Sequence, residues 1–410
     1  MFHGNFPTGI TVEEGVRLLC REAPLPQEES VPLPDCDGRV LARDLLAPES
    51  VPPFARSPYD GYALRAADTV PASEQTPVTL SILEEVPAGH APRFAVGPGQ
   101  ATKILTGAPI PEGADLVVMY EETTFTDQQV TLTRSYPSGK NVVPVGEDIL
   151  EGQLVAKKGT LLSPATLGLL AGLGFTQLPV YRRPVVGLIS TGDELVGLGE
   201  ALTPGKIRNS SVYALKAYLE RLGAQVQLHG IVGDDAGAIA QRVQQAAASA
   251  DLVITTGGVS VGDYDLVGQA MQQLDARVLF WKVKMKPGSA LLASCYQGKP
   301  VLSLSGNPAS AAVSFFLLGI PLLRTMAGRT DIQLPQVQVR LKEAFPKASP
   351  GRRLIPGQLE IQDGQAVLAL MPKQGNGMLA PLFGCDLLGE IPAGSPALPA
   401  GSVLNAYRIF

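Results

Sequence analysis

Residues 252–265 read L-V-I-T-T-G-G-V-S-V-G-D-Y-D. The apolar run Leu252–Ile254 leads into two threonines and two glycines, which is typical of a buried parallel strand that ends in a loop with few side chains. Ligands of open α/β sheets bind just past such strand ends, where glycines let backbone N–H groups approach an anion. Asp263 and Asp265 then offer carboxylates for a divalent cation. A tight strand-to-helix turn with Asp265 as its N-cap explains the same loop without any ligand.

The surrounding residues 184–330 alternate between strand-like and helix-like segments. Besides the central strand, we expect strands at 185–190, 225–232, 278–283 and 301–304, and helices at 211–222, 238–248, 266–274 and 309–326. This alternation predicts a parallel sheet wrapped by helices.

Five strands of this predicted sheet end in loops of glycine and polar residues. The loops are Gly192-Asp193-Glu194, Asp234-Asp235, Gly257 to Asp265, Lys286-Pro287-Gly288 and Gly306-Asn307-Pro308. Because the carboxyl ends of parallel strands lie at one edge of a sheet, the acids Glu194, Asp234 and Asp265 would share that edge with Lys282 and Lys286. Carboxylates for a metal and lysines for an anion, among free backbone N–H groups, predict a site for a phosphorylated ligand.

Two regions with short strands flank the α/β part. Residues 51–150 are rich in proline and glycine, with expected strands at 78–83, 101–105, 116–119 and 130–133. Residues 330–410 predict a small β-barrel or sandwich, with strands at 337–341, 357–361, 366–370 and 403–408. A helix that begins after Thr11, its expected N-cap, and the helix-like residues 153–183 predict one discontinuous domain around the first of these regions.

Three motifs of the first β-rich region place a carboxylate beside a glycine. They read S-P-Y-D-G-Y-A at 57–63, T-G-A-P-I-P-E-G-A-D at 106–115 and G-E-D at 146–148. Turn chemistry explains any one of them, whereas the three together favour a shared surface site, since loops carry function.

Composition limits the class of protein. The 410 residues are 17% charged and 45% apolar with a net charge of −5, so a large core and two to four domains are expected. No long basic run is present, which argues against nucleic-acid binding. Four separated cysteines without a C-x-x-C predict free thiols. The first residues lack a signal-peptide pattern, and the longest apolar stretch, 309–323, is too interrupted to span a bilayer, so we expect a cytoplasmic protein without a membrane partner.

Seven motifs occur together in one order along the chain. They are S-P-Y-D-G-Y-A, T-G-A-P-x-P-E-G-A-D, G-E-D, S-T-G-D-E-L, T-T-G-G-V-S-V-G-D-Y-D, K-P-G and S-G-N-P-A-S-A. Over about residues 8–410 the chain thereby resembles the molybdopterin molybdotransferases of the MoeA family, which are related to the E domain of gephyrin. The resemblance implies a multidomain α/β plus β fold, in which a three-layer parallel-sheet molybdopterin-binding domain is 184–328. A discontinuous N-terminal domain (1–46 and 153–183), an inserted β-rich domain (47–152) and a C-terminal β-barrel (329–410) complete it.

The resemblance also implies an activity. Adenylylated molybdopterin and molybdate would give molybdenum cofactor and AMP with Mg²⁺, the last step of molybdenum cofactor synthesis. Family members are homodimers with a composite site, so Asp60, Thr106 and Asp148 would come from the partner subunit. Molybdopterin adenylyltransferase and molybdoenzyme apoproteins or their chaperones are the implied protein partners.

Site residues are carried over motif by motif. Catalytic roles fall on Asp60, Glu194, Asp234, Asp265, Lys282 and Lys286, of which Glu194, Asp234 and Asp265 would hold the magnesium or polarise the attacking oxygen. The implied ligand-binding residues are Thr106, Asp148, Thr191, Gly192, Asp193, Gly257, Gly258, Ser260, Gly262, Pro287, Gly288, Gly306, Asn307 and Pro308. Lys282 and Lys286 would neutralise phosphate or molybdate, a form of oxyanion stabilisation.

Some positions depart from the family pattern. Val143-Pro144-Val145 and Pro356 stand where arginines are common, Ser305 replaces a proline, and Asn376–Pro381 lacks the usual serines. The missing arginines and serines are those expected near molybdate, so a non-catalytic scaffold or a protein of altered oxyanion choice, such as tungstate, is the alternative. A molybdopterin adenylyltransferase on the same α/β domain is a third hypothesis, against which the flanking β domains argue.

Overall fold

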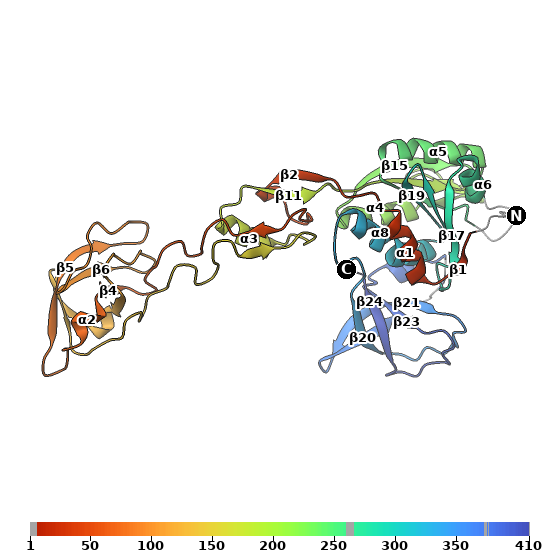
Figure 1. Ribbon diagram of the computed structural model, residues 1–410. Coiled ribbons are helices and arrows are strands. Elements are labelled where there is room, and N and C mark those ends of the chain that lie inside the picture. The colour runs from red at the N-terminus through yellow and green to blue at the C-terminus, as the bar shows by residue number, and fades with distance from the viewer. Residues whose placement is uncertain (1–5, 260–265, 373–374, 376, 410) are drawn as a thin grey trace. The chain divides into compact units, whose positions relative to one another are not determined.

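The computed structural model describes residues 6–259, 266–372, 375 and 377–409 (Figure 1). The chain forms two compact units. The first comprises Met1–Ala42, Gly159–Ser163 and Leu178–Phe410, and the second comprises Arg43–Lys158 and Pro164–Gln177. The four-domain division expected from the sequence is finer than these units and stays a prediction.

The first unit is built on a seven-stranded sheet, counted over the described residues. Its order is β1 (Thr8–Ile10), β17 (Arg277–Val283), β18 (Leu291–Tyr296), β19 (Lys299–Leu304), β16 (Leu252–Thr256), β12 (Val185–Thr191) and β15 (Gln225–Val232). Only β18 among these strands is antiparallel to its neighbours. The predicted parallel strands are therefore confirmed, and β18, which the sequence analysis did not identify, lies between two of them.

Helices cover both faces of this sheet (Figure 1). One face packs against α5 (Ala236–Ser249) and α6 (Leu266–Gln273). The other packs against α1 (Val12–Arg21), α4 (Ser211–Arg221), α7 (Pro308–Ser314), the π-helical turn η3 (Phe315–Gly319) and α8 (Ile320–Met326). Fully buried Phe280 and Phe315 anchor that second core. The expected three-layer α/β architecture is confirmed.

Two helices of this unit illustrate how sequence sets structure. Thr11 begins α1 with a capping box, because its hydroxyl accepts from the N–H of Glu14 (3.1 Å) and the Glu14 carboxylate accepts from the N–H of Thr11 (2.9 Å). The continuous helix Pro308–Met326 is the one helix of the described residues that is long and apolar enough to cross a membrane. Since 89% of its most apolar window is buried inside the protein, this is weak evidence for a membrane span.

A closed barrel is the second large part of the first unit. Its five strands follow the order β20 (Gln336–Leu341), β22 (Gln365–Leu370), β21 (Arg353–Gln362), β23 (Leu387–Ile391) and β24 (Val403–Arg408). The start of β21 is hydrogen-bonded to the loop after β17, because the N–H of Leu354 donates to the carbonyl of Lys286 (2.9 Å). The barrel thus contributes side chains beside the carboxyl edge of the large sheet.

Short elements occupy the rest of this unit. β2 (Glu28–Pro32) pairs with β11 (Gln177–Tyr181), and β13 (Leu195–Val196) pairs with β14 (Ile207–Arg208). The 3₁₀ turns η1 (Leu33–Asp35) and η4 (Ala380–Leu382) lie in connecting loops.

The second unit contains a six-stranded sheet of described residues. Its order is β7 (Leu116–Met119), β4 (Gly61–Leu64), β6 (Gln100–Ile104), β5 (Val78–Val86), β9 (Gln129–Leu132) and β8 (Thr124–Phe125). The four predicted strands are confirmed, whereas β4, which overlaps the S-P-Y-D-G-Y-A motif, was not expected to be a strand. The unit also has α2 (Ala66–Thr69), η2 (Tyr120–Glu122), α3 (Pro164–Gly172) and the pair β3 (Leu45–Leu46) and β10 (Leu154–Ala156).

Candidate active site

A cavity of about 660 Å³ opens at the carboxyl edge of the large sheet. Its walls come from residues that follow β12, β16 and β19, three strands that are neighbours in the sheet. Seven of the residues expected from the sequence line it, namely Thr191, Glu194, Gly257, Gly258, Gly306, Asn307 and Pro308. Three of the five predicted strand-end loops, those after β12, β16 and β19, therefore meet at this cavity.

Gly257 brings the backbones of two strands together at the floor of this cavity. Its φ is +98°, and a Cβ there would lie 2.2 Å from the carbonyl oxygen of Thr191. The N–H of Gly257 donates to the carbonyl of Leu304 (3.0 Å), which ties the end of β16 to β19. No side chain but hydrogen fits this position, so the wall is made of backbone.

The polar residues before α4 form another wall that the sequence analysis missed. Asn209 is 7% exposed and its Nδ2 donates to the hydroxyl of Ser190 (2.8 Å), so it anchors the start of α4 to β12. Lys206 and Arg208 line the cavity beside it. Ser210, the N-cap of α4, makes no side-chain cap bond, and Ser210 and Ser211 line the cavity, so the uncapped start of this helix borders it. The R-N-S-S run before the helix was the available signal.

The predicted acidic residues divide into two groups. Glu194 lines the cavity. Asp193 and Asp234 bond to each other's backbone instead: the N–H of Asp193 donates to Oδ2 of Asp234 (3.4 Å), and the N–H of Asp234 donates to Oδ1 of Asp193 (3.1 Å). This reciprocal pair joins the loops after β12 and β15, and Asp234 does not line the cavity.

The predicted magnesium ligands are therefore only partly assembled. Asp265, together with Ser260 and Gly262, lies outside the described residues. Within the described residues no group of three His, Cys, Asp or Glu side chains fits a metal ion. The donor set present does not complete a cation site, and the magnesium assignment stays a prediction.

A second cavity of about 200 Å³ contains the other predicted cation. Lys286 and Pro287 line it from the loop after β17, and Lys347 and Arg353 line it from the barrel side. Because β18 separates β17 from β19, Lys286 does not line the large cavity. The expectation that Lys286 would share one cavity with Glu194 is corrected for this geometric reason.

The two cavities nevertheless lie next to each other along one helix. Pro308, the first residue of α7, lines the large cavity, and Ala309 lines the small one. Gly288 is buried against the same helix, where the Ser314 hydroxyl donates to its carbonyl (2.9 Å). A ligand in the large cavity and an anion in the small one would thus meet near the start of α7.

Arg353 is a cation of the small cavity that the sequence analysis did not identify. Its Nε donates to the Ser349 hydroxyl (3.0 Å) and its guanidinium lies 5.5 Å from the centre of the Phe345 ring, so two contacts fix its position. Pro356, where the family pattern has an arginine, lines the same cavity. The sequence analysis expected this cavity to lack a cation, because Pro356 replaces an arginine. Arg353 and Lys347 give the cavity positive charge instead.

Lys282 lies apart from both cavities. Its Nζ is 3.8 Å from the centre of the Trp281 ring, a cation–π contact. It lines neither cavity among the described residues. The sequence analysis expected Lys282 near Lys286 because both lie at the end of the same strand. Lys282 has a φ of +61°, which interrupts the regular alternation of side chains there.

In the second unit, Asp60 and Thr106 are in direct contact. Oδ1 of Asp60 accepts from the N–H (2.7 Å) and from the hydroxyl (2.8 Å) of Thr106. These two donors, the backbone one first, lower the pKa of Asp60. The N–H of Asp148 donates to the carbonyl of Val51 (3.0 Å), and residues 56 and 143 form a bridge between the same two segments. Hydrogen bonds therefore join the loop of Asp60 to the loop of Thr106. They also join residues 51–56, which precede Asp60, to residues 143–148.

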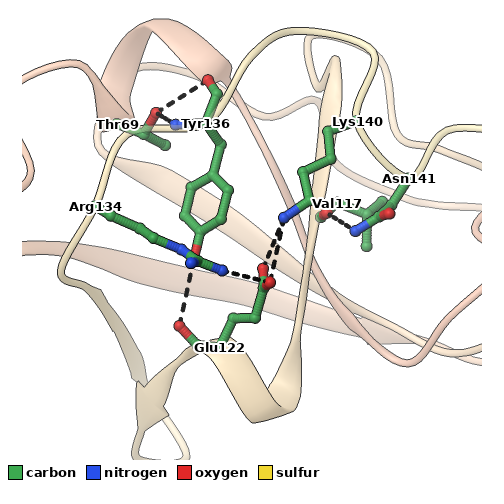
Figure 2. Close-up of polar contacts among 7 residues, drawn as sticks. All are labelled: Thr69, Val117, Glu122, Arg134, Tyr136, Lys140 and Asn141. Carbon is green, nitrogen blue, oxygen red and sulfur yellow. Dashed lines mark hydrogen bonds and ion pairs between the residues drawn. The ribbon is translucent and has the colours of Figure 1, made fainter.

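A cluster of polar contacts in the same unit holds residues 134–141, which precede Asp148 in the chain (Figure 2). Glu122 accepts from Lys140 (2.9 Å) and pairs with Arg134, and the Lys140 ammonium lies 4.5 Å from the centre of the Tyr136 ring. Burial alone would raise the pKa of Glu122, but Lys140 and Arg134 lower it overall. Nδ2 of Asn141 donates to the carbonyl of Val117 (2.9 Å), which covers the edge of β7.

The chain matches known proteins along nearly its whole length. Three family models match in succession: "MoeA N-terminal region (domain I and II)" at residues 10–174, "Probable molybdopterin binding domain" at 187–325 and "MoeA C-terminal region (domain IV)" at 338–409. The molybdopterin molybdenumtransferase of Bacillus subtilis (strain 168) is 36% identical over 406 residues, which cover 98% of this chain and 94% of that protein. The one of Staphylococcus aureus (strain MSSA476) is 33% identical over 396 residues, which cover 97% and 94%.

A solved structure agrees with these matches. The molybdopterin biosynthesis MoeA protein from Pyrococcus horikoshii superposes with a TM-score of 0.87 at 32% identity, over 98% of this chain and 99% of that one. Identity above 30% over almost the full length, together with the same fold, confirms the resemblance carried by the seven motifs. The chain therefore belongs to the MoeA family of molybdopterin molybdenumtransferases.

Proposed function

We propose that this protein inserts molybdate into adenylylated molybdopterin, with release of AMP, as the last step of molybdenum cofactor synthesis. The observation that carries the proposal is that a large cavity at the ends of three parallel strands and a small basic cavity adjoin at the start of α7. The matched relatives are named molybdopterin molybdenumtransferases, which supports the transfer of molybdenum to molybdopterin. The two cavities suit its two substrates, a phosphorylated pterin and a small oxyanion.

The large cavity would hold the pterin and its phosphate groups. Ser210 and Ser211 at the start of α4 line this cavity, and the helix dipole favours negative charge at that end, so phosphate oxygens are favoured there. Lys206 and Arg208 add positive charge at the same wall. Glu194 is the carboxylate placed to accept a proton or a hydrogen bond within this cavity.

The small cavity would hold molybdate. Lys286, Lys347 and Arg353 give it three cationic side chains, and a tetrahedral dianion needs such charge-assisted donors. The scaffold alternative was suggested by arginines missing from the family pattern. Since Arg353 and Lys347 restore cations to this cavity, nothing in the geometry favours that alternative over the enzyme.

The family resemblance supports four further features of this function. These are the magnesium dependence, the homodimer with a composite site, the cytoplasmic location and the partner proteins that supply adenylylated molybdopterin or receive the cofactor. No step is assigned to magnesium, because the described acids do not complete a ligand set. Light scattering of the purified protein would test the dimer by its mass.

An insertion assay tests the proposal directly. Purified protein is given adenylylated molybdopterin and magnesium, with molybdate or tungstate in parallel, and AMP release and formation of active cofactor are measured. We expect AMP release and active cofactor with molybdate. Binding of the pterin without AMP release under either oxyanion would contradict the enzyme and support the scaffold alternative, whereas release with tungstate alone would establish altered specificity.

A further inference from the structure

A small cavity at the amino edge of the large sheet is lined by arginines. It lies where the chain enters β12, where α4 and α8 end, and beside residues 38–40, so it is at the opposite edge from the candidate active site. Among the described residues that line it, five are arginines and none is acidic: Arg39, Arg182, Arg183, Arg324 and Arg329. So many cations at one cavity require a source of negative charge.

Carboxylates from outside the cavity neutralise three of the five. Glu29 pairs with Arg39, and Asp331 pairs with Arg329. Asp251 accepts two bonds from Nη2 of Arg182, both of 2.9 Å. In the part of the chain that the structure describes, neither Arg183 nor Arg324 pairs with a carboxylate, so the cavity keeps two positive charges in excess.

Arg324 is the cation whose environment is least favourable. Its Nη1 donates to the carbonyls of Asp331 (3.1 Å) and Gln333 (2.6 Å), while its buried Nε has no acceptor among the described residues. Burial first, and then the neighbouring charge of Arg329, lower the pKa of Arg324, and the carboxylate of Asp331 offsets these two effects only in part. A further anion at the cavity would offset the remainder, since an opposite charge favours the charged form.

The arginines are not required to cap the two helices that end at this cavity. The last carbonyls of α4 accept from the N–H groups of Leu222, Gly223 and Ala224. Those of α8 accept from the N–H groups of Ala327, Gly328 and Arg329. Because backbone groups already satisfy these carbonyls, helix capping does not account for the arginine cluster.

We propose that this arginine cluster binds a phosphate-type oxyanion, either free or as the terminal group of a larger molecule. Guanidinium groups present planar pairs of donors that match phosphate oxygens. The cavity has a volume of about 20 Å³, room for roughly one water-sized group. One oxygen of the anion therefore enters the cavity, and the remainder lies at its mouth, where Arg183 is exposed. The site goes beyond the proposed function and uses none of its residues.

Binding of inorganic phosphate, measured by calorimetry at constant ionic strength, tests the proposal. The full chain carrying Lys206→Ala, Arg208→Ala and Lys286→Ala serves as the background, so that the cations of the two cavities in the candidate active site do not contribute. Arg183→Gln in that background is expected to weaken phosphate binding about tenfold, the effect of one lost charge-assisted contact. Arg17→Gln, an exposed arginine on α1, is the matched control and is expected to leave binding unchanged.

A second variant and a second probe complete the test. Arg324→Lys keeps the charge but changes the donor geometry, and it is expected to weaken phosphate binding with an unchanged circular dichroism spectrum. AMP is tested in the same background: weaker AMP binding by the Arg183→Gln chain than by the Arg17→Gln chain identifies a phosphate group on a larger molecule as a ligand of the arginine cluster, whereas equal AMP binding restricts the cluster to free phosphate. No phosphate binding by the background chain, or equal binding by the Arg183→Gln and Arg17→Gln chains, would overturn the proposal.

Discussion

The two cavities at the carboxyl edge of the sheet differ in what makes them. The large cavity is formed by loops that follow three adjacent parallel strands, and its floor is backbone that only glycine permits. The small cavity draws on two separate layers, the loop after β17 and the barrel, and its character comes from cationic side chains. Backbone packing determines the form of the large cavity, and cationic side chains determine the charge of the small one. We therefore expect substitutions in the large cavity to lower stability and substitutions in the small cavity to weaken anion binding.

The strongest effect is expected from a change of shape in the large cavity. Gly257→Ala would place a Cβ 2.2 Å from the Thr191 carbonyl oxygen, at a φ of +98°. We expect a loss of about 3 kcal/mol or more of stability. The single tryptophan, Trp281, lies in the same sheet, so its fluorescence during denaturant unfolding follows this unit.

Gly298→Ala is the matched control for that substitution. Gly298 also has a positive φ, +74°, but a Cβ there has no atom within 4 Å. Only the backbone strain remains, about 1–2 kcal/mol. If both variants lost the same stability, the close approach at Gly257 would not be what shapes the cavity floor.

The next effect concerns charge in the small cavity. Lys286→Ala is expected to raise the molybdate concentration needed for half-maximal insertion about 10- to 100-fold, because one charge-assisted contact is lost. Binding of the adenylylated pterin, measured separately by calorimetry, should be unchanged. Lys284→Ala removes an exposed lysine two residues away and is the control. An equal loss of pterin affinity and molybdate response would join the two cavities into one binding site.

Arg353→Gln sharpens the same distinction with a smaller effect. Lys286 and Lys347 would remain in the cavity, so we expect the molybdate requirement to rise about fivefold to tenfold. Arg353→Lys keeps the charge but loses the Nε bond to Ser349, and it should recover part of the response. A wild-type molybdate response from Arg353→Gln would show that the barrel does not contribute to oxyanion binding.

The comparison also explains which features were predictable from the sequence. The large cavity depends on strands that read as buried apolar runs followed by glycine loops, so local pattern was enough to place Gly257 and Asn307 together. The small cavity depends on β18, an antiparallel strand that the pattern of alternating strands and helices does not anticipate. The sequence signal of its hairpin with β19 was Gly298, because the two-residue turn 297–298 requires positive φ, which glycine adopts readily.

Arg353 was not predictable in the same way. It reaches the loop after β17 only because β21 of the barrel pairs with Lys286, a contact between segments far apart in the sequence. Local motifs carry no information about such pairing. The departure at Pro356 therefore suggested a missing cation, while the compensating one lay three residues earlier in a position that only the fold defines.

The smallest effect is expected in the second unit. There, two hydrogen bonds from Thr106 fix the carboxylate of Asp60. The pKa of Asp60 is lowered because Thr106 donates its N–H and its hydroxyl to the carboxylate. A carboxyl with a lowered native pKa stabilises the fold above its unfolded pKa, and that contribution disappears as pH falls through the native pKa. Thr106→Val removes the hydroxyl donor and keeps the N–H, so the native pKa of Asp60 should rise part of the way to its usual value and the contribution should be lost at higher pH. Carboxyl ¹³C NMR titration measures this, with Thr79→Val, whose hydroxyl bonds to Thr131 instead, as control. An unchanged Asp60 titration in the Thr106→Val chain would assign the lowered pKa to the backbone donor alone.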